Sequence, residues 1–352
     1  MVRTNCAAVM NIHVGIIGGG NISETHARAA RAIPGVNVAA VYGTNSERVA
    51  RLSAEHGAVP YDDFQRFLAH RPMDFVAIGS PSGLHAEQGI AAAGSGLHVL
   101  CEKPLDISTA RADALIAAAS AAGIKLGVFF QDRFKTDLLR VKQWMDTGVL
   151  GKPLLSDARV KWFRPANYYT DSQWRGTLRL DGGGALINQA VHTVDLLLWL
   201  FGDVAAVQAV RKTALHKIEA EDTLVATLEF ANGAIGTLQA ATSVYPGYPR
   251  RVELTGSEGT VIIEHDRLLA ADLRHHPADF RSTGDDQNAS ASSATVSDVR
   301  GHQAVLEDFI RAIRSDGTPS CSGAEARRSV RLVEAIYAAC ATGKRVALER
   351  PT

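Results

Sequence analysis

The stretch IHVGIIGGGNISETHARAARAI (residues 12–33) decides the fold of this chain. Residues 12–17 are predicted to form a short buried strand, a glycine-rich turn follows at once, and residues 24–33 have the composition of a helix. A strand, a glycine turn and a helix in this order are typical of a phosphate-binding turn. Gly18 allows the tight turn, and Gly20 has no Cβ that would keep a pyrophosphate from the first amides of the helix.

The third position of this motif is Ser23 instead of the usual Gly or Ala. A hydroxyl is tolerable there and would be able to donate to a phosphate. The alternative is a turn with a purely structural role. If the turn binds a dinucleotide, the residues expected to contact it are Gly18, Gly20, Asn21 and Ile22.

The second strand, residues 36–42, ends where dinucleotide-binding folds usually carry an acidic residue that holds the adenosine ribose 2′-hydroxyl. This chain has Gly43 there. Without a carboxylate to repel it, a 2′-phosphate is acceptable, with Thr44, Asn45 and Arg48 as donors. We therefore expect NAD or NADP as the cofactor and favour NADP, while noting that Arg48 also fits a solvated helix position.

The strand and helix pattern repeats, with strands predicted at residues 74–79, 97–101 and 125–130 and helices at residues 86–93 and 108–122. Such alternation predicts a parallel, doubly wound sheet, whose ligands bind beyond the carboxyl ends of the strands. The turn SPSGLH (residues 80–85) and the tripeptide EKP (residues 102–104) both follow strands, so we expect them to share one crevice with the glycine turn. The cofactor candidates in these two segments are Ser80, Pro81, His85, Glu102 and Lys103.

The pattern changes after Lys135. A helix is predicted at residues 136–147 and a long strand at 154–163, followed by an aromatic and arginine-rich loop, RPANYYTDSQWRGT (residues 164–177). About six strand-like segments with no long helix between them lie in residues 204–272, which indicates an open antiparallel sheet. Residues 281–299 are polar and are expected to form a mobile surface loop, and two helices (301–314 and 323–342) close the chain.

The expected fold is an α/β Rossmann dinucleotide-binding domain over residues 1–126, followed by an α+β domain with an open, mostly antiparallel sheet over residues 127–352. A chain of 352 residues is long enough for two cores. We expect the second domain to bind the substrate and to mediate oligomerisation, and its C-terminal helices are free to pack back on the first domain.

The composition describes a soluble globular protein and argues against several functions. Hydrophobic residues make up 46% and charged residues 21% of the chain, and 37 basic residues balance 37 acidic ones, so nucleic acid finds no excess of positive charge. No apolar run is long enough for a membrane span, and the N-terminus is a poor signal peptide. Cys6, Cys101, Cys321 and Cys340 lack CxxC spacing, which argues against disulfides and a cysteine zinc site. We therefore expect a cytoplasmic protein.

The stretch DGGGALINQAVHTVDLLLWL (residues 181–200) carries the candidate chemistry. After three glycines it is apolar on nearly every side, which predicts a buried helix. At about 100° per residue, Asn188, His192 and Asp195 fall in a polar stripe roughly 60° wide. A buried polar side chain without a hydrogen bond costs about 1–3 kcal/mol. The stripe is therefore either a core histidine satisfied by Asp195 or one wall of an active site.

Four segments, GIIGGGNISETHARA, SPSGLHAEQGIAAA, HVLCEKP and GGGALINQAVHTVDLLLWLFG, occur in this order. Together they resemble the Gfo/Idh/MocA family of NAD(P)-dependent sugar and polyol dehydrogenases, over roughly residues 11–348. The resemblance implies that Lys103 lies beside the nicotinamide and reaches the reacting hydroxyl. It also implies that Glu102 contacts the nicotinamide ribose and that His192 faces the substrate.

Asn188 departs from the inositol-type members, many of which carry an aspartate four residues before the histidine. An asparagine cannot ionise, so a proton-relay role is lost, and hydrogen bonding to a substrate hydroxyl or to Lys103 remains. The helix and the loop YYTDSQWRGT look closest to members that act on nucleotide-activated or modified sugars.

Hydride transfer from a secondary alcohol also requires the loss of the hydroxyl proton. A positioned base contributes about 10²–10⁴-fold, and a cation stabilises the developing alkoxide. His192 suits the role of base and Lys103 that of cation. The roles are reversed if a dry pocket lowers the lysine pKa far enough. Asp195 either orients His192 or packs the helix.

The aromatic loop offers further substrate contacts, since aromatic faces stack on sugar rings and arginine pairs with carboxylate or phosphate. The substrate-binding candidates are Lys103, Arg164, Tyr168, Tyr169, Trp174, Arg175, Asn188 and His192. The alternative is a loop that plugs the crevice or meets a neighbouring subunit. Arg133 is a further position at the mouth of the crevice, without an assigned role.

The expected function is hydride transfer between NAD(P) and a ring hydroxyl or ketone of a sugar, a sugar derivative or a cyclitol, without a metal. One alternative is a redox-assisted glycosidase or epimerase that retains its cofactor. A second is a catalytically silent nucleotide sensor, and the presence of both Lys103 and His192 argues against this second alternative. A sheet covered by helices on one face leaves apolar surface on the other, so we expect a homodimer or homotetramer through the second sheet.

Overall fold

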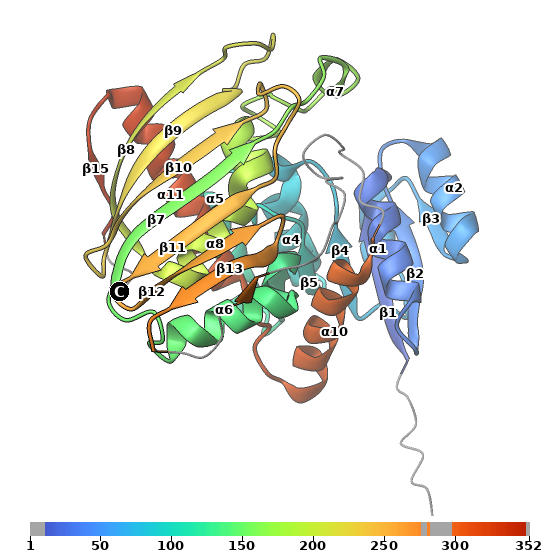
Figure 1. The fold of residues 1–352 in the computed structure, drawn as a ribbon. Coiled ribbons are helices and arrows are strands. Elements are labelled where there is room, and N and C mark those ends of the chain that lie inside the picture. Colours follow the sequence, from blue (N-terminus) through green and yellow to red (C-terminus); the bar gives the residue numbers. More distant parts are fainter. Residues whose placement is uncertain (1–10, 276–279, 282–297, 350–352) are drawn as a thin grey trace, which may run out of the picture.

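The structure is a computed structural model that describes residues 11–275, 280–281 and 298–349. Two sheets organise it, one near each end of the view in Figure 1. The first sheet has six strands in the order β3-β2-β1-β4-β5-β6, and all its neighbours are parallel. Its strands are β1 (Ile12–Ile17), β2 (Val36–Tyr42), β3 (Val59–Tyr61), β4 (Phe75–Ile78), β5 (His98–Cys101) and β6 (Leu126–Val128).

Helices cover both faces of this sheet. They are α1 (Asn21–Arg31), α2 (Ser46–His56), α3 (Phe64–Leu68), α4 (His85–Gly94) and α5 (Thr109–Ala121), with the short 3₁₀ helices η1 (Ser82–Leu84) and η2 (Gln131–Phe134). The strand order reverses beside β1, and the strand ends at that edge carry the glycine turn, η1 and the start of the EKP segment. This is the place where such sheets bind ligands.

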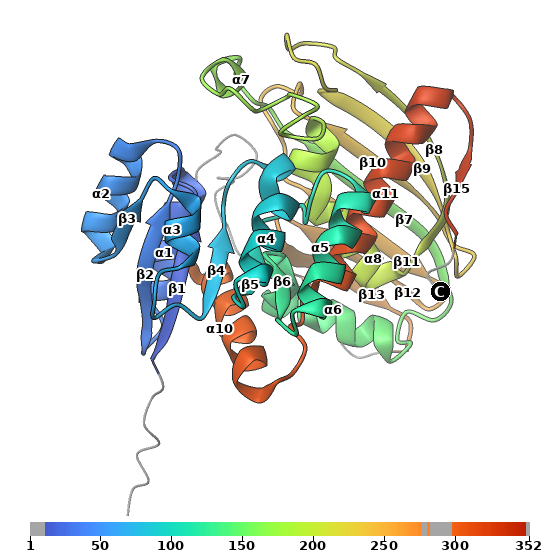
Figure 2. The same cartoon turned by 180° about the vertical axis from the view of Figure 1, so that it is seen from behind.

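The last helices of the chain, α10 (Arg300–Ser315) and α11 (Gly323–Thr342), return to the first sheet. Helix α10 shares one hydrophobic core with β1, β2 and α1 through Val305, Leu306, Phe309 and Ile310. The ring of Phe309 meets Phe75 of β4 edge-on, with centroids 5.4 Å apart. α11 lies against α5 and β6 on the opposite face, as Figure 2 shows. The prediction that C-terminal helices can pack back on the first domain agrees with these contacts.

The second sheet has nine strands in the order β14-β13-β12-β11-β7-β10-β9-β8-β15. They are β7 (Pro153–Lys161), β8 (Val204–Lys212), β9 (Thr223–Phe230), β10 (Ile235–Ala241), β11 (Arg251–Gly256), β12 (Gly259–Glu264), β13 (Arg267–Leu273), β14 (Phe280–Arg281) and β15 (Val346–Ala347). Among the described strands of this sheet, β7 and β10 are the one parallel pair. The helices beside the second sheet are α6 (Thr136–Asp146), α7 (Asn167–Thr170), the π-helix η3 (Ala185–Ala190) and α8 (Val191–Phe201).

One face of the second sheet packs on α6, α8 and α11 around a large apolar core. Strand β9 alternates buried and exposed residues along its length, because it has one covered and one open face. Figure 1 looks onto the open face. The predicted α/β sheet followed by an open, mostly antiparallel sheet is confirmed.

The boundary between the domains stays a prediction. Strand β6 belongs to the first sheet and runs to Val128, two residues past the expected boundary at residue 126. Of the polar segment 281–299, residues 282–297 lie outside the described residues, as does Cys6. Cys101, Cys321 and Cys340 are free thiols. Within the described ranges, no helix is long and apolar enough to cross a membrane.

Candidate active site

The glycine turn has the shape that an anion needs. Gly20 is the N-cap of α1, no side chain caps the helix, and a Cβ built on Gly20 would meet nothing within 4 Å. Gly18 has φ +127°, and a Cβ there would lie 2.8 Å from the carbonyl oxygen of Gly79. The amides of Asn21 and Ile22 therefore begin the helix with open space in front of them, which fits a dinucleotide pyrophosphate.

Ser23 does not take part in this opening. Its side chain is fully buried, and its hydroxyl lies 2.6 Å from where a Gly18 Cβ would be. The hydroxyl therefore fills the space behind the glycine turn, and the idea that it donates to a phosphate is wrong for this geometry.

The end of β2 has no room for a side chain at position 43. A Cβ on Gly43 would lie 3.0 Å from Val49 and 3.4 Å from the backbone of Gly18. Asn45 caps α2, since its Oδ1 accepts from the backbone N–H of Arg48 at 2.9 Å, so that oxygen is already used. The side chains of Thr44 and Arg48 are exposed beside the glycine turn.

The turn between β4 and α4 is tied to the EKP segment by His85. Its Nδ1 lies 2.8 Å from the carbonyl oxygen of Pro104 and its Nε2 lies 3.0 Å from that of Ser80. The ring is buried, and burial lowers its pKa. Both nitrogens face the backbone, so His85 holds two turns together and has no nitrogen left for the cofactor. Ser80 donates its hydroxyl to Gln88, and Pro81 is partly exposed.

Lys103 joins the two halves of the molecule. It follows β5 of the first sheet, and its Nζ donates to the backbone oxygen of Asn188 in η3 at 2.9 Å. Burial lowers the pKa of Lys103, while the carboxylates of Glu102 and Asp181 raise it. The strand-end lysine and the helix beside the second sheet, far apart in the sequence, thus meet at one place.

The helix that carries His192 begins as a π-helix, η3, and continues as α8. The carboxylate of Glu221 accepts hydrogen bonds from two backbone N–H groups at the start of this helix, from Gly184 at 3.2 Å and from Leu186 at 2.9 Å. A Cβ on Gly184 would lie 1.8 Å from the carbonyl oxygen of Glu221, so only glycine allows this approach. The helix is buried, as predicted, but a regular polar stripe is wrong because the wider π-turn changes the direction of the residues before α8.

Asp195 does not contact His192. Its carboxylate accepts two hydrogen bonds from Arg133, at 2.6 and 2.8 Å, and both side chains are buried. The expectation that Asp195 satisfies or orients His192 is therefore wrong, and Arg133 is a core residue with no place at the mouth of the site. The carboxylate nearest to His192 belongs to Asp132 in η2, whose Oδ2 lies 3.8 Å from Nδ1.

His192 is nearly enclosed, with 14% of its side chain exposed. Burial lowers its pKa to about 3, the charge of Asp132 opposes this shift, and the charge of Lys103 adds to it. Asp132 also accepts from Arg250 at 2.7 Å and lies 3.2 Å from Lys135. Burial would raise the pKa of Asp132, but these two cations and His192 hold it well below its usual range. The site therefore holds a neutral imidazole beside a fixed anion.

A polar network backs the substrate side of η3. The Nδ2 of Asn188 donates to Asp181 at 2.5 Å, and its Oδ1 accepts from Gln189 at 2.6 Å. Gln189 also contacts Arg164 at 2.9 Å and the hydroxyl of Tyr168 at 2.9 Å. Burial raises the pKa of Asp181 to about 6. The expected bond between Asn188 and Lys103 exists, but it uses the backbone oxygen of Asn188 and leaves the side chain to Asp181.

The aromatic loop divides into buried and accessible parts. Tyr169 is buried, its hydroxyl bonds to Thr242 at 2.8 Å, and its ring lies 4.8 Å from that of His216. Trp174 and Arg175 are partly exposed, and the Arg175 guanidinium lies 4.1 Å from the ring centre of Tyr168. Of the predicted substrate contacts in this loop, Tyr169 is thus buried with its hydroxyl engaged, whereas Tyr168, Trp174 and Arg175 are partly exposed.

Both halves of the chain match one known family. Residues 12–130 match the oxidoreductase family with an NAD-binding Rossmann fold, and residues 138–262 match the GFO/IDH/MocA C-terminal domain. The chain belongs to the GFO/IDH/MocA oxidoreductase family. The resemblance drawn from the motifs is thus confirmed, together with the oxidoreductase class and the dinucleotide-binding Rossmann domain.

Relatives within the GFO/IDH/MocA family agree over almost the whole chain. The crystal structure of the WlbA dehydrogenase from Bordetella pertussis, in complex with NADH and UDP-GlcNAcA, is 31% identical, covers 97% of this chain and all of its own, and has a TM-score of 0.87. Myo-inositol 2-dehydrogenase from Thermotoga maritima is 24% identical over 91% of this chain and 94% of its own length. D-glucoside 3-dehydrogenase from Escherichia coli is 24% identical over 96% and 97%.

Three residues of this site escaped prediction. Asp132 follows β6, so the rule that ligands gather at strand ends would have found it. Asp181 and Gln189 lie within the stretch that was singled out, but their roles depend on contacts with Asn188, Arg164 and Tyr168 that no sequence periodicity encodes.

Proposed function

We propose that this enzyme transfers a hydride between NAD(P) and a ring hydroxyl or ketone of a sugar, a sugar derivative or a cyclitol, with Lys103 and His192 at the reacting oxygen. The observation that carries the proposal is the hydrogen bond from Lys103 Nζ to the backbone oxygen of Asn188, one turn before His192. Through this bond, a cation of the dinucleotide-binding half contacts the helix of the other half that carries the His192 imidazole.

The cofactor, when bound, accepts or supplies the hydride. The chain's own residues handle the proton. The negative charge of Asp132 near Nδ1 favours the tautomer of His192 with its proton on Nδ1, which leaves Nε2 free to accept the proton of the substrate hydroxyl. Asp132 then stabilises the imidazolium, while Lys103 uses its remaining N–H groups to stabilise the alkoxide. In the reverse direction, His192 returns the proton to the new hydroxyl.

For the choice of cofactor, the end of β2 favours NADP. Gly43 offers no carboxylate, and the exposed Arg48 and Thr44 beside the glycine turn suit a 2′-phosphate. The Bordetella relative was solved with NADH. A comparison of kcat/KM for NAD and NADP decides between them.

For the substrate, the accessible part of the aromatic loop supports a derivatised sugar. Trp174 offers a face on which a sugar ring stacks, and Arg175 offers a charge that pairs with a carboxylate or phosphate. The WlbA relative binds UDP-GlcNAcA, which carries such charges, whereas the inositol and glucoside relatives are named for neutral polyols. A nucleotide-activated sugar acid therefore belongs in the first set of compounds to test.

The test is an absorbance assay for reduced nicotinamide with a panel of cyclitols, free sugars and nucleotide-activated sugars, run with each cofactor. The active compound is then used with Lys103→Met and His192→Asn. We expect kcat to fall by about 10²–10⁴-fold in each, because a proton acceptor or an alkoxide partner is lost. Lys152→Met, which removes an exposed lysine, is the control and should retain wild-type rates.

Two outcomes contradict the proposal. Turnover of a sugar with no net change in reduced nicotinamide, by a protein that keeps its cofactor through gel filtration, indicates a redox-assisted glycosidase or epimerase. Full activity in both variants removes Lys103 and His192 from the chemistry.

A further inference from the structure

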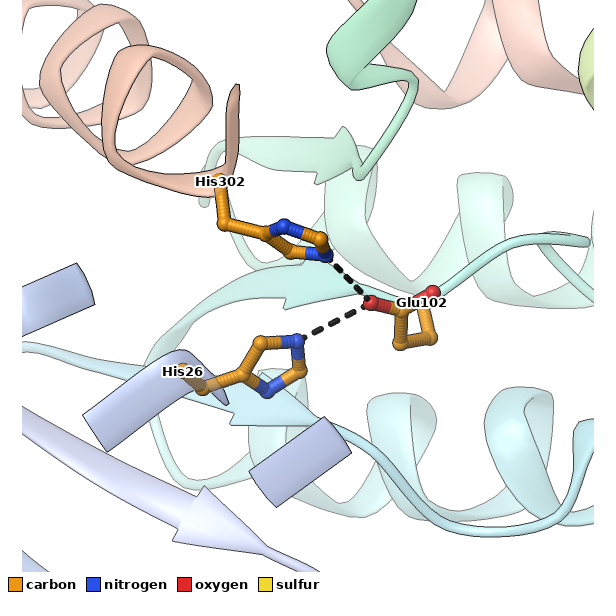
Figure 3. Close-up of side chains that lie close together, drawn as sticks. All are labelled: His26, Glu102 and His302. Carbon is orange, nitrogen blue, oxygen red and sulfur yellow. Dashed lines mark hydrogen bonds and ion pairs between the residues drawn. The ribbon is translucent and has the colours of Figure 1, made fainter. Parts of the chain in front are cut away.

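Glu102 sits at the centre of a buried cluster that the proposed reaction does not use directly. Its Oε1 accepts from Nε2 of His26 at 3.0 Å and lies 3.5 Å from Nε2 of His302, so that both rings point at one oxygen (Figure 3). The other oxygen, Oε2, accepts from the backbone N–H of Lys103 at 3.2 Å. The three residues come from α1, the end of β5 and α10.

The two imidazoles are held rigidly. His26 stacks on Phe129 with ring centroids 4.3 Å apart and planes 12° apart, and His302 lies 5.4 Å from the same ring. Both histidines are almost fully buried, at 1% and 2% exposure. Burial lowers the pKa of His26, which favours the neutral ring, and Nε2 is the nitrogen that faces Glu102.

The arrangement keeps Glu102 charged although it is buried. Burial raises the pKa of this carboxyl, but the hydrogen bonds of His26 and His302 outweigh burial and hold the pKa well below its usual range. The other titratable groups that face Glu102 are Cys101 and Lys103 beside it, His85 on α4 and His192 on α8. Of all these groups, only the two histidines of the cluster contact Oε1.

A metal ion is a weaker account of this geometry. His26, Glu102 and His302 offer three ligand atoms within 4.8 Å of one another. Zinc, however, requires each ligand at about 2.0–2.2 Å from a shared centre. Here the nitrogens converge on the oxygen itself, and the distance of 3.0 Å between Nε2 of His26 and Oε1 is that of a direct hydrogen bond.

We propose that His26 and His302 are positioning residues for cofactor binding, whose ring N–H groups hold Glu102 as an anion turned toward the nicotinamide ribose. The inference rests on the proposed function, in which Glu102 accepts from a ribose hydroxyl. The Glu102 side chain keeps 9% of its surface exposed, and this is the part that a ribose can reach. Because His302 belongs to α10, cofactor affinity depends on a helix from the far end of the chain.

The test compares His302→Met with His302→Gln in cofactor titrations between pH 8 and pH 6. Methionine removes the N–H donor and has a side chain of similar length to histidine. The glutamine amide keeps an N–H donor, and this donor does not titrate. For His302→Met we expect the Kd for the preferred cofactor to rise about tenfold at pH 8, the effect of one hydrogen bond to a charged group. Toward pH 6 the ratio to wild type should grow, because burial raises the pKa of the Glu102 carboxyl and one of the two donors that oppose burial is lost.

Three further variants make the result specific. His302→Gln should stay within about threefold of wild type at every pH, since its donor remains. The Kd of His302→Met at pH 6 should approach that of Glu102→Gln, which carries no charge at any pH. His56→Met is the matched control, because it removes a comparable bond between α2 and Glu24 of α1, 3.3 Å away, and should not change the pH dependence.

Several results overturn the inference. One is wild-type affinity in His302→Met across the pH range, and another is an equal loss in His302→Gln and His302→Met. Stoichiometric zinc in the purified protein that is lost in His302→Gln would make the cluster a metal site. If the wild type binds neither nucleotide, the proposed function itself fails. Should His302→Met not fold, Glu102→Gln against wild type gives the same comparison of affinity and pH dependence.

Discussion

His192 is a buried imidazole whose pKa of about 3 makes it a feeble base unless a counter-charge acts during the reaction. Asp132 supplies that charge at 3.8 Å, and Arg250 and Lys135 fix it in place. Because the pKa is so low, His192 is unprotonated throughout pH 5–8. Its ability to accept a proton then depends on what stabilises the imidazolium, and the carboxylate of Asp132, 3.8 Å from Nδ1, is placed to do so.

We predict that Asp132→Asn lowers kcat at least tenfold, since about one pKa unit of charge stabilisation is lost from the imidazolium. The cofactor Kd should not change. Asp266→Asn is the matched control, because Asp266 pairs with the same Arg250 and Lys135 but does not contact His192. Equal rates in the two variants, measured with unchanged melting temperatures, would show that Asp132 acts only through its ion pairs.

The helix that starts with the π-turn η3 is the element that best separates what sequence can predict from what it cannot. Its burial follows from composition, and the apolar residues of 186–198 are indeed inside. The stripe of Asn188, His192 and Asp195 assumed a regular α-helix, and the π-turn invalidates that assumption. The buried carboxylate of Glu221 accepts from the first amides of this helix, and Glu221 lies just before β9, 35 to 37 residues away in the sequence, so no local pattern predicts these contacts.

At this element we predict that Asn188→Asp is harmful unless Asp181 changes too. Asp181 has a pKa raised to about 6 by burial and lies 2.5 Å from the Asn188 amide. Two carboxylates at this distance cannot both ionise, so one folded-state pKa rises further. A raised carboxyl pKa stabilises the fold at acid pH, and this contribution is lost as the pH rises through the folded value.

Asn188→Asp should therefore melt several degrees below wild type at pH 8 and much closer to it at pH 5, given about 1.4 kcal/mol for each pKa unit. The double variant Asn188→Asp with Asp181→Asn reverses the two positions and should remove most of this pH dependence. Melting curves at the two pH values decide the matter. A pH-independent loss in the single variant would contradict the electrostatic reason.

For the whole molecule, the large features could be read from the sequence because they depend on local patterns. Strand and helix alternation gave the parallel sheet, and short strands with turns gave the open one. The side-chain pairings inside the site could not be predicted from the sequence, because they join segments that are far apart in the chain. Examples are the ion pair of Arg133 with Asp195 and the contacts of Glu102 with His26 and His302. Lys103 and His192 could be proposed from the sequence because each belongs to a recognisable motif, whereas the residues that contact them do not.

The open face of the second sheet bears on assembly. Val210 and Ile235 expose 69% and 59% of their surface there, and each is paired with another exposed apolar residue, Val225 and Leu155 respectively. We propose that a second copy covers this face, which gives a homodimer or, with a further contact, a homotetramer.

We predict that light scattering at micromolar concentration finds at least a dimer, and that Val210→Lys combined with Ile235→Lys converts it to a monomer. Charges on a covered apolar face are costly because they lose water without gaining partners. Val59→Lys, at the edge of the first sheet, is the control and should leave the assembly intact. A monomeric wild type would exclude this interface.

The return of α10 to the first sheet affects how the protein is made. Val305, Leu306, Phe309 and Ile310 complete the core formed by β1, β2 and α1, so the N-terminal half lacks part of its interior until the C-terminal helices have been synthesised. During synthesis, the N-terminal half therefore exposes apolar surface until α10 has left the ribosome, and chaperones recognise such surface. A fragment ending near residue 130 would keep every strand of the nucleotide-binding sheet and still lack the helix that closes it.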